Sequence, residues 1–260
     1  MSDNDIHYPP EFIAKLEMLW GDGFLSPGGP PEVAEILAGL DISGKKVLDI
    51  GCGIGGIDVL LAETYGAGSV LGIDIEDPVL DRARERVAER GLDGKVSFQR
   101  VDPGPLPFED ASFEVVFSKD AMIHIPDKQA LYADLFRILK PRGLLVASDW
   151  LKGFSGPYSD TMKAWIKGVG LQFEMASGEE TRAALEAAGF IDVEVRSRND
   201  WYREEGRNEL QRIGGELREA AIDLLGEDGH RNWLTTRENM IKVLDTGEFC
   251  PSHMRARRAS

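Results

Sequence analysis

Glycines and acids gather in one short segment, KKVLDIGCGIGGIDVLL, over residues 45–61. Gly51, Gly53 and Gly56 match the spacing G-x-G-x-x-G, and Asp49 comes just before them in a predicted strand. Glycines between a strand and a helix let the backbone turn tightly, and the first N–H groups of the helix attract a negative charge. Such a loop suits a pyrophosphate or a carboxylate equally well. The spacing alone also fits a tight turn without a ligand.

Two further acids follow later predicted strands. Asp74 ends the second strand in VLGIDI, where a carboxylate can accept hydrogen bonds from ribose hydroxyls. Asp102 follows the third strand in FQRVDPGPLPF. Because parallel strands end at the same edge of a sheet, one ligand laid across them would meet both acids. Either acid alone fits a helix cap or a turn, but their combination with the glycine loop favours a ligand site.

The elements that must position these residues alternate along the chain. Apolar runs typical of strands occur near 46–50, 69–73, 95–100, 113–117, 142–148, 190–197 and 249–257. Helical patterns occur near 55–65, 77–90, 128–139 and 178–188. The alternation predicts an α/β fold with a doubly wound, mostly parallel sheet. Residues 201–247 interrupt it with consecutive amphipathic helices, which predict a helical lid insertion before the last strand.

Length and charge narrow the class of protein. A chain of 260 residues with 42% apolar residues can bury one sizeable core, so we expect a single domain over 1–260. The net charge of −15 argues against binding to nucleic acid or to an anionic membrane. Cys52 and Cys250 form no disulfide framework, and no cysteine or histidine spacing predicts a metal site. These features favour a cytoplasmic protein with a small-molecule partner, and they leave the oligomeric state open.

Four motifs together resemble the class I S-adenosylmethionine-dependent methyltransferases: VLDIGCGIGG, GIDI, VDPGPLPFEDASFEVVFS and LKPRGLLVASDW. The resemblance implies S-adenosyl-L-methionine as the cofactor. It also places Asp49 near the methionine amino group and gives the methionine part room at Gly51 and Gly53. The remaining cofactor contacts expected from the later motifs are Asp74, Ile75, Asp102, Pro103 and Lys119.

A narrower resemblance covers most of the chain. The segments GFLSPGGPPEVAEIL and SKDAMIHIPDK and the helical insertion are similar to the phosphoethanolamine N-methyltransferase family and its relatives that act on small amines. This resemblance implies that the turn containing Leu25 and Ser26 closes over the cofactor, so that residues 1–29 form a covering segment. It also implies that Tyr8, a further cofactor contact, pairs with His124.

Asp120 stands four residues before His124, a spacing that puts two side chains on one face of a helix. With Tyr8, these residues form the expected catalytic group. An imidazole titrates near neutrality, so His124 is suited to take the proton that an acceptor amine must lose.

The resemblance weakens where family members hold the substrate phosphate. By alignment, those positions carry Trp150, Trp165, Val169 and Leu171, which predicts an acceptor without phosphate. Trp150 and Trp165 would wall a site for a cation, which gains ~0.5 to 2 kcal/mol over an aromatic face, although both also fit an ordinary core. Arg237 aligns roughly with a basic residue of the family's insertion and would hold an acceptor carboxylate.

Several functions remain open from the sequence. Methyl transfer to an amine nitrogen is the leading hypothesis, and transfer to a thioether sulfur, which needs no base, is the alternative. A nicotinamide oxidoreductase is disfavoured because it would leave Asp49 and the downstream motifs without a purpose. A cofactor-binding protein without chemistry is disfavoured by Asp120 and His124.

Overall fold

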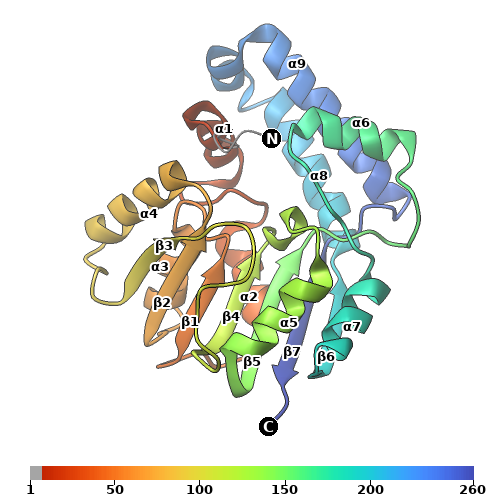
Figure 1. Ribbon diagram of the computed structural model, residues 1–260. Helices are drawn as coiled ribbons and strands as arrows, with labels where there is room; N and C mark the ends of the chain where they lie inside the picture. Colours follow the sequence, from red (N-terminus) through yellow and green to blue (C-terminus); the bar gives the residue numbers. More distant parts are fainter. Residues whose placement is uncertain (1–7) are drawn as a thin grey trace.

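The computed structural model of the protein describes residues 8–260 and contains one seven-stranded sheet in the order β3-β2-β1-β4-β5-β7-β6 (Figure 1). The first five strands run parallel, whereas β7 pairs antiparallel with both β5 and β6. The strands are β1 (Lys46–Ile50), β2 (Ser69–Asp74), β3 (Val96–Arg100), β4 (Phe113–Lys119), β5 (Leu139–Asp149), β6 (Phe190–Ser197) and β7 (Ser252–Arg258). The predicted α/β fold with a mostly parallel sheet is confirmed.

Helices cover both faces of this sheet, and the alternating side chains of the strands explain why. In β1, Val47 packs with α2, α3 and α4 on one face, and the next residue, Leu48, packs with α5 and α7 on the other. The five helices are α2 (Gly29–Leu37), α3 (Gly56–Glu63), α4 (Asp77–Glu89), α5 (Lys128–Ile138) and α7 (Gly178–Ala187). The central strands are therefore buried on both sides.

A second group of helices lies beyond the edge at which the parallel strands end (Figure 1). We call this group the helical cap, and it consists of α1 (Pro10–Trp20), α6 (Asp160–Val169), α8 (Asn199–Gly214) and α9 (Arg218–Asp245). α8 and α9 approach closely at Gly206, where an added Cβ atom would lie 3.0 Å from Met240 Cε. The chain bends within α9 at Gly226, whose φ is +72°. None of the described helices is long and apolar enough to cross a membrane.

The helices of the cap were only partly foreseen. The predicted insertion of helices over 201–247 is present as α8 and α9, between β6 and β7. The helices α1 and α6 were not predicted. α6 is short, and a local cap stabilises its first turn: Ser159 Oγ accepts a hydrogen bond from the Met162 N–H at 3.1 Å.

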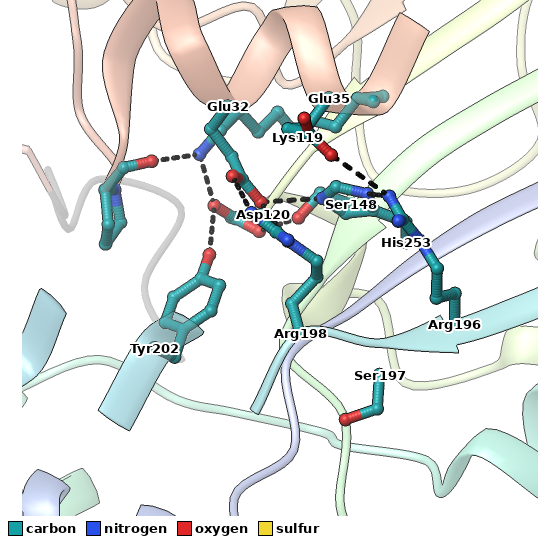
Figure 2. A network of polar contacts seen from close by, with 12 residues as sticks. Glu32, Glu35, Lys119, Asp120, Ser148, Arg196, Ser197, Arg198, Tyr202 and His253 are labelled. Atoms are coloured by element: carbon teal, nitrogen blue, oxygen red, sulfur yellow. Dashed lines mark hydrogen bonds and ion pairs between the residues drawn. The ribbon is translucent and has the colours of Figure 1, made fainter. Parts of the chain in front are cut away.

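A buried carboxylate joins three distant parts of this fold. Glu32 of α2 is 1% exposed. It accepts two hydrogen bonds from Arg198, at 3.0 and 2.6 Å, and lies 2.7 Å from His253 Nε2 of β7 (Figure 2). Burial alone would raise the pKa of Glu32, but the hydrogen bonds from His253 and Arg198 lower it to about 2. The ionised form of Glu32 therefore stabilises the fold.

We expect Glu32→Gln to lower the free energy of unfolding at pH 7 by roughly 3 kcal/mol, because it removes one partner of a buried ion pair. The folded-state pKa of about 2 lies below the ordinary 4.5, so this stability is present above pH 4.5 and is lost as the pH falls through 2. Urea titrations of wild type and variant should therefore converge between pH 4.5 and 2. Glu85→Gln, at an exposed position of α4, is the control. A difference that stays constant with pH would contradict this role.

Candidate active site

The glycine loop turns sharply between β1 and α3. Gly51 and Gly53 have φ values of +71° and +53°, in the left-handed region that favours glycine. The N–H groups of Gly51 and Cys52 donate to the Ile73 carbonyl at 2.9 and 3.1 Å, which fixes the loop to the end of β2. A Cβ atom on Gly51 would lie 2.2 Å from the Ala121 Cβ atom, so no larger residue fits there. The predicted arrangement of strand, glycine loop and helix is present.

Three carboxylates surround this loop. Asp74 Oδ2 accepts from the Gly53 N–H at 3.1 Å, and Asp74 Oδ1 accepts from the Ile75 N–H at 2.8 Å. Asp49 and Asp58 are almost fully buried, and within residues 8–260 neither carboxylate has a hydrogen-bond partner. Burial raises the pKa of Asp49 well above its usual range, and the neighbouring Asp58 and Asp74 carboxylates raise it further.

An unpaired buried carboxylate is costly, and a cation beside it removes that cost. The amino group and sulfonium of S-adenosylmethionine carry positive charge, so the two orphaned carboxylates fit this cofactor. A nicotinamide dinucleotide would bring a pyrophosphate to the same acids. The charge of the loop therefore discriminates between the two cofactors that its glycine spacing allows.

The other expected cofactor residues lie along the same edge of the sheet. Asp102 is exposed just beyond β3 and pairs with Arg100 at 2.8 Å. Pro103 is exposed beside it, and Ile75, just beyond β2, leaves 42% of its surface exposed. The ends of β1, β2 and β3 thus bring the predicted group together.

Lys119, at the end of β4, holds the N-terminal turn in place. Its side chain is completely buried, and its Nζ donates to Ser26 Oγ at 2.7 Å and to the Pro27 carbonyl at 2.8 Å. Leu25 of the same turn lies over the glycine loop, because a Cβ atom on Gly53 would come 3.0 Å from Leu25 Cδ1. We predicted Lys119 as a cofactor contact, and the structure shows its ammonium fastening the turn that lies over the loop.

Asp120 connects this turn to the helical cap (Figure 2). Its Oδ2 lies 2.6 Å from Lys119 Nζ and 3.5 Å from the hydroxyl of Tyr202 on α8, and its Oδ1 accepts from Ser148 Oγ at 2.8 Å. The predicted helical face shared by Asp120 and His124 is wrong. Asp120 has a left-handed φ of +56°, and only the short 3-10 helix η1 (Met122–His124) follows it.

A backbone carbonyl orients the ring of His124. Its Nδ1 lies 2.9 Å from the carbonyl oxygen of Gln172, which can only accept a hydrogen bond. In the neutral ring the hydrogen is therefore on Nδ1 and the lone pair is on Nε2. The ring lies beside Phe173, with centroids 5.6 Å apart.

Tyr8, the other member of the expected catalytic pair, packs against Phe12 with ring centroids 5.5 Å apart. Burial raises the pKa of Tyr8, and the nearby carboxylates of Asp74 and Glu76 raise it further. The phenol is therefore protonated at neutral pH, where it can donate a hydrogen bond.

One pocket between the sheet edge and the helical cap contains all the predicted catalytic and substrate residues. Trp150 and Trp165 form part of its wall with ring centroids 5.7 Å apart, and both are also buried in an apolar cluster. The two interpretations from the sequence, core and pocket wall, therefore hold together. The residues lining the pocket are Tyr8, Phe12, Lys15, Leu16, Trp20, Leu25, Ser26, Asp120, Ile123, His124, Trp150, Trp165, Val169, Leu171, Phe173, Trp233, Thr236 and Arg237.

Arg237 occupies the cap side of the pocket. Its Nη1 pairs with Glu209 Oε2 at 2.9 Å, and its guanidinium lies 5.3 Å from the centre of the Trp20 ring. Trp20 Nε1 donates to the other oxygen of Glu209 at 2.5 Å. Arg237 Nε is buried and lacks a hydrogen-bond partner in the described chain. The predicted carboxylate-binding residue thus lies in the pocket with an unused donor.

Four residues that shape the site are not predicted from the sequence: Lys15, Asp58, Tyr202 and Glu209. Asp58 carried a signal, since it is an acid within the apolar run GIDVLLA. Lys15 carried another, because it stands between the apolar residues of IAKLEMLW. Tyr202 and Glu209 belong to a charged amphipathic segment, where nothing local distinguishes a buried polar residue from an exposed one.

Comparison with known proteins identifies the family. Residues 41–205 match the family described as "Methyltransferase domain". The chain belongs to this family. Phosphoethanolamine N-methyltransferase 1 of Arabidopsis thaliana is 34% identical over 226 residues, which cover 86% of this methyltransferase-family chain and 45% of that protein. The phosphoethanolamine N-methyltransferase of Plasmodium falciparum is 28% identical over 200 residues, which cover 76% of this chain and 73% of that protein.

Solved structures extend the comparison to the fold. Phosphoethanolamine N-methyltransferase 2 of Haemonchus contortus, in complex with phosphomonomethylethanolamine and S-adenosylhomocysteine, has a TM-score of 0.90 and 26% identity. The match covers all of this chain and 61% of that one. The resemblance to class I methyltransferases of the phosphoethanolamine N-methyltransferase family is confirmed, and the chain spans about half the length of the plant relatives it matches.

We expect Asp49→Asn to weaken binding of S-adenosylhomocysteine by about 10- to 100-fold, because a charge-assisted contact to the cofactor's amino group is lost. The same change should leave the melting temperature of the cofactor-free protein equal or higher, since it removes an unpaired buried carboxyl group. Calorimetric titration and thermal unfolding measure the two effects, with the exposed Asp93→Asn as the control. Unchanged affinity would remove Asp49 from the cofactor site.

Proposed function

We propose that this chain transfers the methyl group of S-adenosyl-L-methionine to the nitrogen of a small polar amine. The observation that carries the proposal is the position of His124, with its lone pair on Nε2, in a pocket beside the glycine loop and its orphaned carboxylates. The relatives named as phosphoethanolamine N-methyltransferases support the same chemistry.

When bound, the cofactor supplies a methyl group on a sulfonium. The protein then has to orient the acceptor nitrogen and exclude water, which is mainly a matter of positioning. His124 Nε2 takes the proton of the acceptor ammonium, so that the nitrogen has a lone pair. Tyr8 donates a hydrogen bond near the amine, and Asp120, which is paired with Lys119, holds the N-terminal turn and Tyr202 in place around it. Trp150 and Trp165 stabilise the positive charge of the methylated product.

A thioether acceptor fits less well. A sulfur nucleophile has no proton to lose, so the tautomer that the Gln172 carbonyl imposes on His124 would serve no purpose. The relatives described above are N-methyltransferases by name, which also favours nitrogen.

The covering role of the cap belongs to the same proposal. The turn at Leu25 and Ser26 and the helices over 201–247 enclose the pocket from the side opposite the sheet. Asp120 contacts both, through Lys119 and through Tyr202. The predicted covering segment 1–29 begins outside the described residues, and its described part contributes Tyr8, α1 and the turn.

We expect His124→Ala to reduce N-methylation of the best amine about 100-fold, since general-base assistance is worth about that much. The affinity for S-adenosylhomocysteine should not change. His124→Asn is a sharper variant, because its amide N–H can still donate to the Gln172 carbonyl but it has no basic lone pair. Methyl transfer by either variant at the wild-type rate would contradict the assignment.

The covering role predicts protection from protease. Trypsin cleavage within 201–247 should slow at least threefold when S-adenosylhomocysteine is added, because a closed cap unfolds locally less often. Arg84 on α4 and Arg90 just after it are exposed and provide internal controls. Equal slowing of cleavage at Arg84 and Arg90, or protection of these two sites alone, would show that the cap does not close over the site.

A further inference from the structure

Two cations face the cap side of the pocket from different helices. Lys15 Nζ of α1 lies 5.1 Å from the centre of the Trp233 ring and 5.5 Å from that of Phe12. Arg237 follows Trp233 by four residues on α9, so the two side chains lie on one face of that helix. All four residues line the pocket. The packing of α1 against α9 therefore brings an ammonium and a guanidinium to the same wall.

Lys15 has no anionic partner within the part of the chain that the structure describes. Its Nζ lies over the aromatic faces of Phe12 and Trp233, and Glu11, one turn earlier on α1, is exposed to solvent. Burial and, to a smaller extent, the positive charge of Arg237 lower the pKa of Lys15 to about 8, against a raising effect of Glu11. A half-buried ammonium beside a second cation is stabilised by an anion that contacts both.

The charged residues that line the pocket indicate how much negative charge a bound acceptor would need to neutralise them. Asp120 is balanced by Lys119, and Arg237 is balanced by Glu209. Within residues 8–260, Lys15 is left without an ion pair, and the acid that acts on it, Glu11, is exposed to solvent. A carboxylate carries one negative charge, whereas a phosphate monoester carries about 1.5 to 2 at neutral pH. The pocket is therefore balanced by a carboxylate and overcompensated by a phosphate.

We propose that Lys15 and Arg237 together bind the carboxylate of the acceptor, so that the substrate class is an amine that also carries one carboxylate. This inference rests on the proposed N-methyltransferase function and deepens it. Arg237 contributes its positively charged guanidinium to the pocket wall, and Lys15 offers a freely rotating ammonium. The amine of the same acceptor lies toward His124 and Asp120, on the sheet side of the pocket.

The test is a series of ω-amino carboxylates: glycine, β-alanine, 4-aminobutanoate and 5-aminopentanoate. Each is compared with its amide, which has the same length and no charge, and with phosphoethanolamine. Calorimetric titration into the protein saturated with S-adenosylhomocysteine measures binding without turnover. We expect one carboxylate of the series to bind at least tenfold more tightly than its amide and than phosphoethanolamine.

Variants assign this preference to Lys15. Lys15→Met should lower the affinity for that carboxylate by about 10- to 100-fold and leave the affinity for its amide unchanged, because only the charged contact is lost. Lys15→Arg should retain most of the preference. Lys163→Met is the matched control, at an exposed position of α6 outside the pocket. Equal binding of carboxylate and amide by wild type, or equal weakening of both by Lys15→Met, would overturn the proposal.

The two proposals fail in different ways. Tight, Lys15-dependent binding of a carboxylate without methylation of any amine would overturn the methyl-transfer function and leave the carboxylate site. Methylation of the amides at the rate of the carboxylates would overturn the carboxylate site and leave the function. Stronger binding of phosphoethanolamine than of every carboxylate would overturn the inference that the acceptor carries a singly charged carboxylate instead of a phosphate.

Discussion

The active-site region depends on one buried ammonium group. Lys119 has no solvent contact, so its charge must be satisfied by protein oxygens, and it has three of them: Ser26 Oγ, the Pro27 carbonyl and Asp120 Oδ2. If the N-terminal turn moved away, the charge would lose two of these partners while still buried, at a cost of several kcal/mol. The turn over the glycine loop is therefore held by the end of β4, far from it in sequence.

Acidic and basic groups lie at opposite ends of the site. In the described part of the chain, Asp49 and Asp58 place unpaired carboxyl groups beside the glycine loop, which a cation would ionise, and Lys15 leaves positive charge beside the cap. A zwitterionic acceptor and a cationic cofactor would neutralise both ends when they bind together. The pocket between them is lined mainly by aromatic and aliphatic side chains, so the charges act through a medium that screens them poorly.

The fold was largely predictable from the sequence because it follows from periodic patterns. The strand over 190–197 and the helices that follow the glycine loop show their apolar periodicity directly. The edge of the sheet at which the expected cofactor residues lie was predictable, because Asp74 and Asp102 are each found at the end of a recognisable strand. The relation between Asp120 and His124 was not, because a left-handed φ at a single aspartate leaves no pattern. Lys15 was missed for another reason, since its environment comes from α9, more than 200 residues later in the chain.

The composition of the pocket wall gives the protein an optical property. Trp20, Trp150, Trp165 and Trp233 line the pocket, and the chain contains five tryptophans in all. Indole emission responds to charge and water near the ring, and two of these rings lie beside Arg237 and Lys15. Four of the five indole rings therefore lie at the pocket proposed for the acceptor, so their emission is expected to change when that pocket is filled.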